Sequence, residues 1–264
     1  MNPRKSTAAR RLVPVVILLF LCAGAGIVIL HRSKDFQQPV ATPGGVTNQN
    51  VLFVPGTNDP RSSAVTNQWG AADEGDRVVA LISEGNQLLS QGNYAGAAHK
   101  YEQAVAISPD QEDLHYNLAI ALAKLGKTED AKKQYEEALR IFPDYAEAQN
   151  NLGNLLMSEN KLEEAIVQFR KAIGNMPENA SFHNNLGTAF ARRAKLEEAI
   201  TEFEQAIKYA PAFVEARANL ANALLAKGRV DEAIVQLNEA LRLRPDFKPA
   251  IQAMQRARQR QEGR

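Results

Sequence analysis

Hydrophobic and polar positions follow a helical period over most of the chain, and the whole pattern recurs every 34 residues. A proline marks the same place in each recurrence: Pro109, Pro143, Pro177, Pro211 and Pro245. With this proline at position 32, the sequence divides into five units, 78–111, 112–145, 146–179, 180–213 and 214–247. A spacing kept over five units predicts five copies of one helical building block.

Each unit alternates small and large residues at fixed positions. Position 8 is always small, as Gly85, Ala119, Gly153, Gly187 and Ala221. Positions 20 and 27 are always alanine, beginning with Ala97 and Ala104. Position 24 is large, as Tyr101, Tyr135, Phe169, Phe203 and Leu237. Small residues let two helices approach closely while one large side chain fills the gap, so the pattern predicts an antiparallel pair, helix A at about positions 1–14 and helix B at about 18–31.

The boundaries of these helices are also marked in the sequence. Position 15 favours a left-handed residue that ends helix A, as Gly92, Gly126, Asn160 and Gly228. Ala194 departs from this rule, and we expect a strained stop there. The prolines prevent helix B from continuing, and we expect the aspartates that follow them, Asp110, Asp144 and Asp246, to cap the next helix A.

At these residues the sequence resembles the tetratricopeptide repeat family, over residues 78–247. Its units share the 34-residue length, the small residues at positions 8, 20 and 27, and the proline at position 32. The resemblance implies an all-α fold, a right-handed α-solenoid of stacked helix-turn-helix units. It also implies a concave face, formed mainly by the A helices, that holds peptides or partner proteins.

The two ends of the repeat array are expected to be polar caps, because a solenoid needs solvated outer faces. In the first unit, position 7 is Glu84, whereas the other units have leucine there. Residues 248–264 continue the helix A period with arginines outside, which predicts a C-terminal capping helix and tail. Their net charge of +4 leaves contact with an acidic partner as the alternative, although runs of charge usually form solvated faces.

An apolar run without charge extends over residues 12–30, after a basic segment at 1–11. Its length nearly spans a bilayer core of roughly 30 Å, so we predict a transmembrane signal-anchor helix. The excess of basic residues before it favours a single-pass protein with a cytoplasmic N-terminus and exported, periplasmic or extracytoplasmic repeats. The alternative is a cleaved signal peptide, since Ala23-Gly24-Ala25 resembles a cleavage site.

Residues 31–77 are rich in Pro, Gly, Asn, Gln and Thr and keep no helical period, which predicts a flexible linker. Within it, Val51-Leu52-Phe53-Val54 is a short β-prone patch. We interpret it either as an exposed part of the linker or as a strand that docks on a partner.

Composition and charge narrow the chemistry. The chain carries 31 basic and 30 acidic residues, and no basic stripe with interleaved aromatics occurs, so we expect no nucleic-acid binding. Cys22 is the single cysteine and lies in the apolar run, which leaves no disulfide framework or cysteine metal site in the repeats. The metal, nucleophile and phosphate motifs of common enzymes are absent. We therefore expect no cofactor, no metal, no catalytic residues and no small-molecule substrate.

The candidate site is a ladder of polar residues on the A helices. Positions 6 and 9 share one helix face, and position 5 lies beside them. The candidate binding residues are Asn86, Tyr116, Asn117, Asn150, Asn151, Asn154, Asn184, Asn185, Asn219 and Asn222. Carboxamides donate and accept hydrogen bonds, so such a column can pair with the backbone of an extended peptide. The alternative is that the ladder bonds adjacent A helices to one another. Lys124 and Arg192 at position 13 are sparse candidates for holding a carboxylate.

Together these features predict a non-catalytic scaffold that binds a peptide or partner protein at a membrane surface. Two alternatives remain open. The chain could recruit substrates for a separate enzyme such as a glycosyltransferase, since the asparagine ladder resembles that of O-linked N-acetylglucosamine transferases. It could instead be a cytosol-facing receptor for import or chaperone docking.

Overall fold

The computed structural model describes residues 71–263, which form eleven helices and no strand. The A helices are α1 (Ala71–Ser90), α3 (Glu112–Lys124), α5 (Ala146–Ser158), α7 (Ala180–Arg192) and α9 (Val214–Ala226). The B helices are α2 (Tyr94–Ile107), α4 (Thr128–Ile141), α6 (Leu162–Asn175), α8 (Leu196–Tyr209) and α10 (Val230–Leu243). A last helix, α11 (Lys248–Glu262), follows. The predicted helical-hairpin repeat is confirmed, with each helix B placed one residue earlier than expected.

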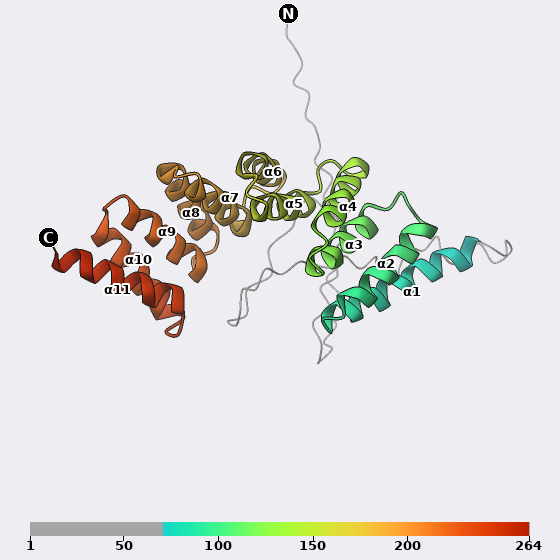
Figure 1. The fold of residues 1–264 in the computed structure, drawn as a ribbon, viewed down its shortest axis with the longest axis horizontal. Helices are drawn as coiled ribbons and strands as arrows, with labels where there is room; N and C mark the ends of the chain where they lie inside the picture. The colour runs from blue at the N-terminus through green and yellow to red at the C-terminus, as the bar shows by residue number, and fades with distance from the viewer. Residues whose placement is uncertain (1–70, 264) are drawn as a thin grey trace, which may run out of the picture.

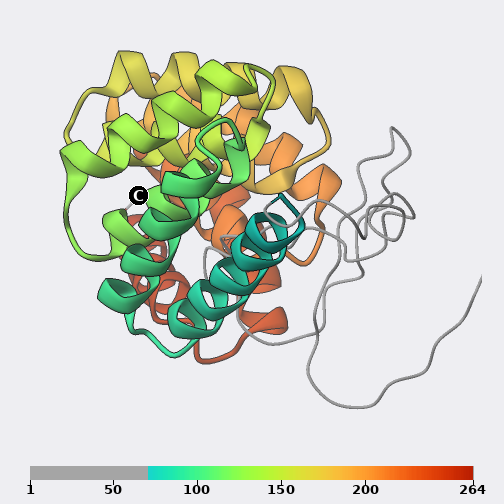
Figure 2. The same ribbon diagram turned by 90° about the vertical axis from the view of Figure 1, so that its right-hand side faces the viewer.

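Successive hairpins stack side by side into an arc (Figure 1). At its centre α3 and α5 lie on the inner side, and α4 and α6 lie on the outer side. Seen after a quarter turn, the helices wind around a common centre (Figure 2), as stacked units with a constant rotation between neighbours do. The A helices therefore form one face of the array and the B helices form the other.

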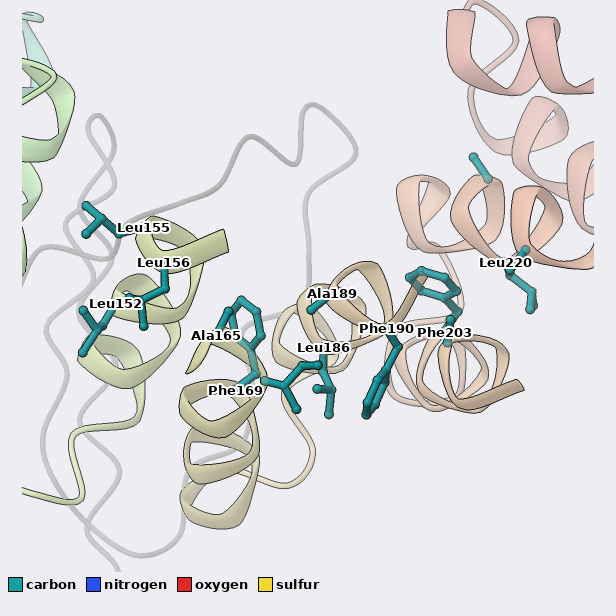
Figure 3. Packing of buried hydrophobic residues seen from close by; sticks show 14 of the residues in the cluster. Leu152, Leu155, Leu156, Ala165, Phe169, Leu186, Ala189, Phe190, Phe203 and Leu220 are labelled. Atoms are coloured by element: carbon teal, nitrogen blue, oxygen red, sulfur yellow. The ribbon is translucent and has the colours of Figure 1, made fainter. Parts of the chain in front are cut away.

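Small and large residues meet within the hairpins as predicted. A Cβ atom added to Gly153 would lie 2.6 Å from the Phe169 ring, and one added to Gly187 would lie 2.7 Å from the Phe203 ring. Both rings are buried among leucines and alanines of neighbouring helices (Figure 3). Position 8 is small because the aromatic ring of helix B occupies the space that a side chain would need.

The turns confirm one expectation and correct another. Ala194 has a φ of 57°, so an alanine takes the left-handed place that glycine holds in most other units. Asp110, Asp144 and Asp246, however, do not cap the next helix, and this prediction is wrong. The N-cap residue is the one at position 34, one residue beyond each aspartate, and only in α7 does its side chain act, where Asn179 accepts from the Ser181 amide at 3.0 Å.

The first hairpin differs from the others. Its A helix begins at Ala71, so residues 71–77, assigned above to the linker, are helical. Glu84 is exposed and pairs with Lys100 at 2.6 Å, which agrees with a polar outer face. Helix α2 has no acid in its first turn, and Asn93 caps it by accepting from the Gly96 amide at 3.0 Å.

Helix α11 completes the other end as a sixth A helix. It buries Ala250, Ala253, Met254 and Ala257 against the fifth hairpin and leaves Arg258 exposed. None of the helices within residues 71–263 is long and apolar enough to cross a membrane. The predicted anchor at 12–30 and the patch at 51–54 lie outside the described residues.

Candidate functional site

The asparagine ladder connects the A helices of neighbouring hairpins. Asn185 on α7 donates from Nδ2 to Oδ1 of Asn150 on α5 at 2.9 Å. Asn219 on α9 donates in the same way to Asn184 on α7, also at 2.9 Å. Each bond runs from position 6 of one unit to position 5 of the unit before it. Of the two interpretations of the ladder, the bond between adjacent A helices is therefore present in the structure.

Between the second and third units, the partner at position 5 is the hydroxyl of a tyrosine instead of a carboxamide. Asn151 donates to the hydroxyl of Tyr116 at 3.1 Å, and its own Oδ1 accepts from Asn150 at 3.3 Å. The Tyr116 ring is 1% exposed and lies 4.8 Å, centroid to centroid, from the ring of Tyr145. Burial raises the pKa of Tyr116 well above its ordinary value, so this hydroxyl stays protonated.

The ladder stops at the first junction. Asn117 occupies position 6 and is fully buried, and both of its side-chain polar atoms lack a hydrogen-bond partner among the described residues. The residue at position 5 of the preceding unit is Ile82, which has no oxygen to offer. This gap explains the unsatisfied carboxamide and places Asn117 out of reach of a ligand.

Three polar groups of the ladder remain available for contact with another molecule. Nδ2 of Asn184 and Oδ1 of Asn185 and Asn219 form no hydrogen bond with the other described residues, and all three side chains are only partly buried. They include both a donor and acceptors, on two successive A helices. Asn150, by contrast, is 8% exposed and uses both of its side-chain atoms within the ladder.

Of the asparagines at position 9, two are bonded to other side chains and one is not. Asn86 accepts from the Tyr101 hydroxyl at 2.7 Å, while its buried Nδ2 has no partner. Asn222 accepts from Arg256 of the capping helix at 3.0 Å. Asn154 is partly buried and makes no hydrogen bond to another described side chain. Asn222 lies three residues after Asn219 on α9 and therefore on the same helix face as the open part of the ladder.

The two candidates for holding a carboxylate, Arg192 and Lys124, differ in their contacts. Arg192 donates to the Met157 carbonyl at 2.6 Å and to Oδ1 of Asn160 at 3.0 Å. Its guanidinium thus stabilises the C-terminal end of α5, where the helix dipole places partial negative charge. Arg260 on α11 repeats this contact with the Leu225 carbonyl of α9. Lys124 is exposed.

Sequence reasoning missed a second set of links, at position 4. His115 and His183 each place Nε2 on the carbonyl of the proline that ends the preceding unit, at 2.8 and 2.9 Å. Gln149 and Arg217 bond the corresponding carbonyls. The signal was available, since position 4 holds His, Gln, His and Arg, which all carry side-chain nitrogen.

His183 differs from the other members because its second partner is charged. Nδ1 lies 2.7 Å from Glu202, whereas His115 meets the neutral Gln134 at the same distance. Burial lowers the pKa of His183, but the bonds to Glu202 and to the Pro177 carbonyl outweigh burial and raise it above the ordinary value. Within residues 74–263, no group of three His, Cys, Asp or Glu side chains is arranged to hold a metal ion.

The fold and these contacts define an all-α repeat solenoid with a polar face on its A helices. The family model of the tetratricopeptide repeat matches residues 88–150 and 190–257, and a second family model, described as TPR repeat, matches residues 153–193. Because these ranges cover most of the array, the chain belongs to the tetratricopeptide repeat family. The resemblance found in the sequence is confirmed.

Known proteins agree at the level of the repeat and the fold. Human small glutamine-rich tetratricopeptide repeat-containing protein beta is 36% identical over 72 residues, which are 27% of this chain and 22% of the human protein. YrrB, described as a TPR protein with an unusual peptide-binding site, superposes with a TM-score of 0.58 at 20% identity, covering 70% of this chain and 96% of YrrB. MamA from Desulfovibrio magneticus RS-1 gives 0.60 at 19%, covering 66% and 98%. These structures share the fold.

Proposed function

We propose that the chain is a non-catalytic scaffold that binds an extended peptide or protein segment on the A-helix face of the fourth and fifth units. The observation that carries this proposal is the set of unused polar groups on Asn184, Asn185 and Asn219. A peptide backbone in an extended conformation offers both amide donors and carbonyl acceptors, which match the open acceptors and donor of these carboxamides. YrrB, whose fold is similar, is described as binding peptide, which supports the class of ligand.

The proposed site contains fewer residues than the sequence predicted, because some of the predicted binding residues are buried. Tyr116, Asn117 and Asn150 are buried, so we leave them outside the proposed site. The remaining bonds hold α5, α7 and α9 in fixed relation, and such preorganisation lowers the entropy cost of binding. The same carboxamides thus set the spacing of the helices and face the ligand.

Site-specific photo-crosslinking in native membranes tests this proposal. A photoreactive residue replaces Thr188, which lies at position 9 of the fourth unit, and a control probe replaces Thr201 on α8. We expect a defined crosslinked partner from position 188 that is absent from position 201. Equal patterns from both positions would exclude a site on the A-helix face.

A matched pair of substitutions separates ligand contact from structural bonding. Asn184→Asp keeps the acceptor for Asn219 and removes the open donor, whereas Asn185→Asp removes the donor to Asn150. We expect Asn184→Asp to reduce crosslinking from position 188 about tenfold with an unchanged midpoint of unfolding, because one hydrogen bond contributes about 0.5–1.5 kcal/mol. Asn185→Asp should lower the midpoint as well.

We also propose that residues 12–30 anchor the repeats to a membrane, with the repeats on the exported side. The support is the uncharged apolar run and the basic residues that precede it. Protease treatment of vesicles whose outer surface is the cytoplasmic one should leave residues 71–263 intact. Digestion of the repeats in these vesicles would instead favour the cytosol-facing receptor, and a mature chain that lacks residues 1–25 would show cleavage.

A further inference from the structure

A cleft of about 200 Å³ opens on the side of the array opposite to the asparagine ladder, between α4 and α6 and above α5. Leu152 and Leu156 of α5 form its floor (Figure 3), and Val167 of α6, which is 50% exposed, forms part of its wall. Leu152 and Leu156 are only 4% and 3% exposed, so Val167 supplies most of the exposed apolar surface of the cleft, and such surface favours contact with an apolar group.

The rim of this cleft is acidic. Glu136 on α4 and Glu164 on α6 stand on opposite walls and are both exposed, while Lys132 is the one cation among the lining residues. The matching cleft one unit earlier, above Leu118 and Leu122, is larger at about 300 Å³, but two lysines balance its two acids. Of these two clefts, the one above α5 combines an apolar floor with a net negative rim.

The equivalent position one unit later shows which kind of side chain can cover the floor of such a cleft. Thirty-four residues after Glu136 the chain has Arg170, and thirty-four after Leu156 it has Phe190. The guanidinium carbon of Arg170 lies 5.6 Å from the centroid of the Phe190 ring. The protein therefore covers the equivalent floor with its own arginine, whose flat cation packs on apolar surface while remaining solvated.

We propose that the cleft above α5 binds a basic segment of a partner protein. An apolar side chain of the partner packs on Leu152, Leu156 and Val167, and an adjacent arginine or lysine enters between Glu136 and Glu164. This surface lies between the B helices α4 and α6, on the side of the array opposite to the peptide site proposed on the A helices. The scaffold then holds two partners at once, one on each face.

Peptide titration of the full-length chain with labelled leucine and valine methyl groups tests the proposal. The probes are acetyl-Leu-Arg-Leu-amide and, as the control, acetyl-Leu-Glu-Leu-amide. We expect the arginine peptide to shift the methyl resonances of Leu152, Leu156 and Val167 in a saturable manner, and the glutamate peptide to leave them in place. No shift with the arginine peptide, or equal shifts with both, would overturn the proposal.

Two substitutions exchange the open and closed junctions. Glu136→Arg places at the open cleft the residue that closes the next one, so affinity for the arginine peptide should fall at least about tenfold. Arg170→Glu should open the next cleft, and the same peptide should then shift the Leu186 methyl groups. Should Glu136→Arg unfold the protein, Glu136→Gln provides the test by removing only the charge. Unchanged affinity in a folded variant would contradict the assignment.

Discussion

The third to fifth units and the first unit have the same hairpin fold but are connected to their neighbours by different chemistry. Between α5, α7 and α9, every junction has a carboxamide on both sides, and each donor meets an oxygen. At the first junction Ile82 stands in place of that oxygen, and Asn117 is buried without a partner. Units with the same hairpin fold can therefore be joined to their neighbours by hydrogen bonds that differ in how much they stabilise the array.

The first hairpin also packs through a small cluster of its own. Val78, Leu81 and Ile82 of α1 join Ala104 and Leu114 in this cluster, whereas Ala97, Ala98 and Tyr101 of α2 belong to the large core that continues through the later units. A buried carboxamide without partners costs about 1–3 kcal/mol. We therefore expect the first hairpin to open before the rest of the array, as terminal units of solenoids do.

The largest expected effect comes from truncating the ring at position 24 in each region. Phe169→Ala should lower the free energy of unfolding by about 3–5 kcal/mol, because the cavity lies inside the continuous core. Tyr101 belongs to the same core but lies in the first hairpin, which we expect to open before the rest, so Tyr101→Ala should abolish hydrogen-exchange protection in α1 and α2 while shifting the main transition by less than about 1 kcal/mol. Equal losses in the main transition for both variants would mean that the first hairpin unfolds together with the rest.

The next largest effect is the difference in stability between removing a hydrogen-bonded carboxamide and removing one without a partner. Asn185→Ala should cost about 1–3 kcal/mol, since it leaves Oδ1 of Asn150 buried without a donor. Asn117→Ala removes a group that already lacks partners, so even with the small cavity that it leaves we expect it to cost less than Asn185→Ala. Chemical denaturation of the two variants under one set of conditions provides the measurement. A larger loss for Asn117→Ala would contradict this explanation of the first junction.

The units, the turns and the close contacts of helices A and B were all predictable, because the 34-residue spacing and the residues at positions 8, 15 and 24 report directly on backbone geometry. The candidate site was predictable only in part. The pattern places Asn184 and Asn219 on one helix face, but it does not reveal that each bonds the position beside it in the neighbouring unit. That pairing depends on the rotation between hairpins, which no single unit determines. The start of α1 at Ala71 was missed because its first residues lie before the repeat and have no counterpart in the other units.

A gain in stability is expected at the turn of the fourth unit. Ala194 holds a φ of 57°, where the Cβ atom costs about 1–2 kcal/mol and glycine is free of this strain. Ala194→Gly should therefore stabilise the chain by roughly 0.5–1 kcal/mol after the greater unfolded-state entropy of glycine is subtracted. The control is Gly228→Ala, which introduces the same strain into the fifth unit and should destabilise it. Thermal unfolding of both variants checks the two signs.

The smallest expected effect is a dependence on pH at position 4. The pKa of His183 is higher in the folded chain than its ordinary value of 6.5. The bond to Glu202 therefore contributes its full stability below that pH and loses it as the pH rises through the folded pKa. We expect about 1 kcal/mol or less from such a pair. Glu202→Gln gives His183 an uncharged partner like the Gln134 that His115 meets, and it should remove this part of the pH dependence, which denaturation at several pH values measures.

The central claim is that the asparagine ladder bonds one hairpin to the next, and a double-mutant cycle on Asn150 and Asn185 tests it most directly. Each residue is changed to Ala alone and then both together, and the free energy of unfolding is measured for the four chains. The 2.9 Å bond predicts that the double variant loses about 1 kcal/mol less than the sum of the single losses. Losses that add within about 0.3 kcal/mol would show that the two carboxamides do not stabilise one another and would contradict the account.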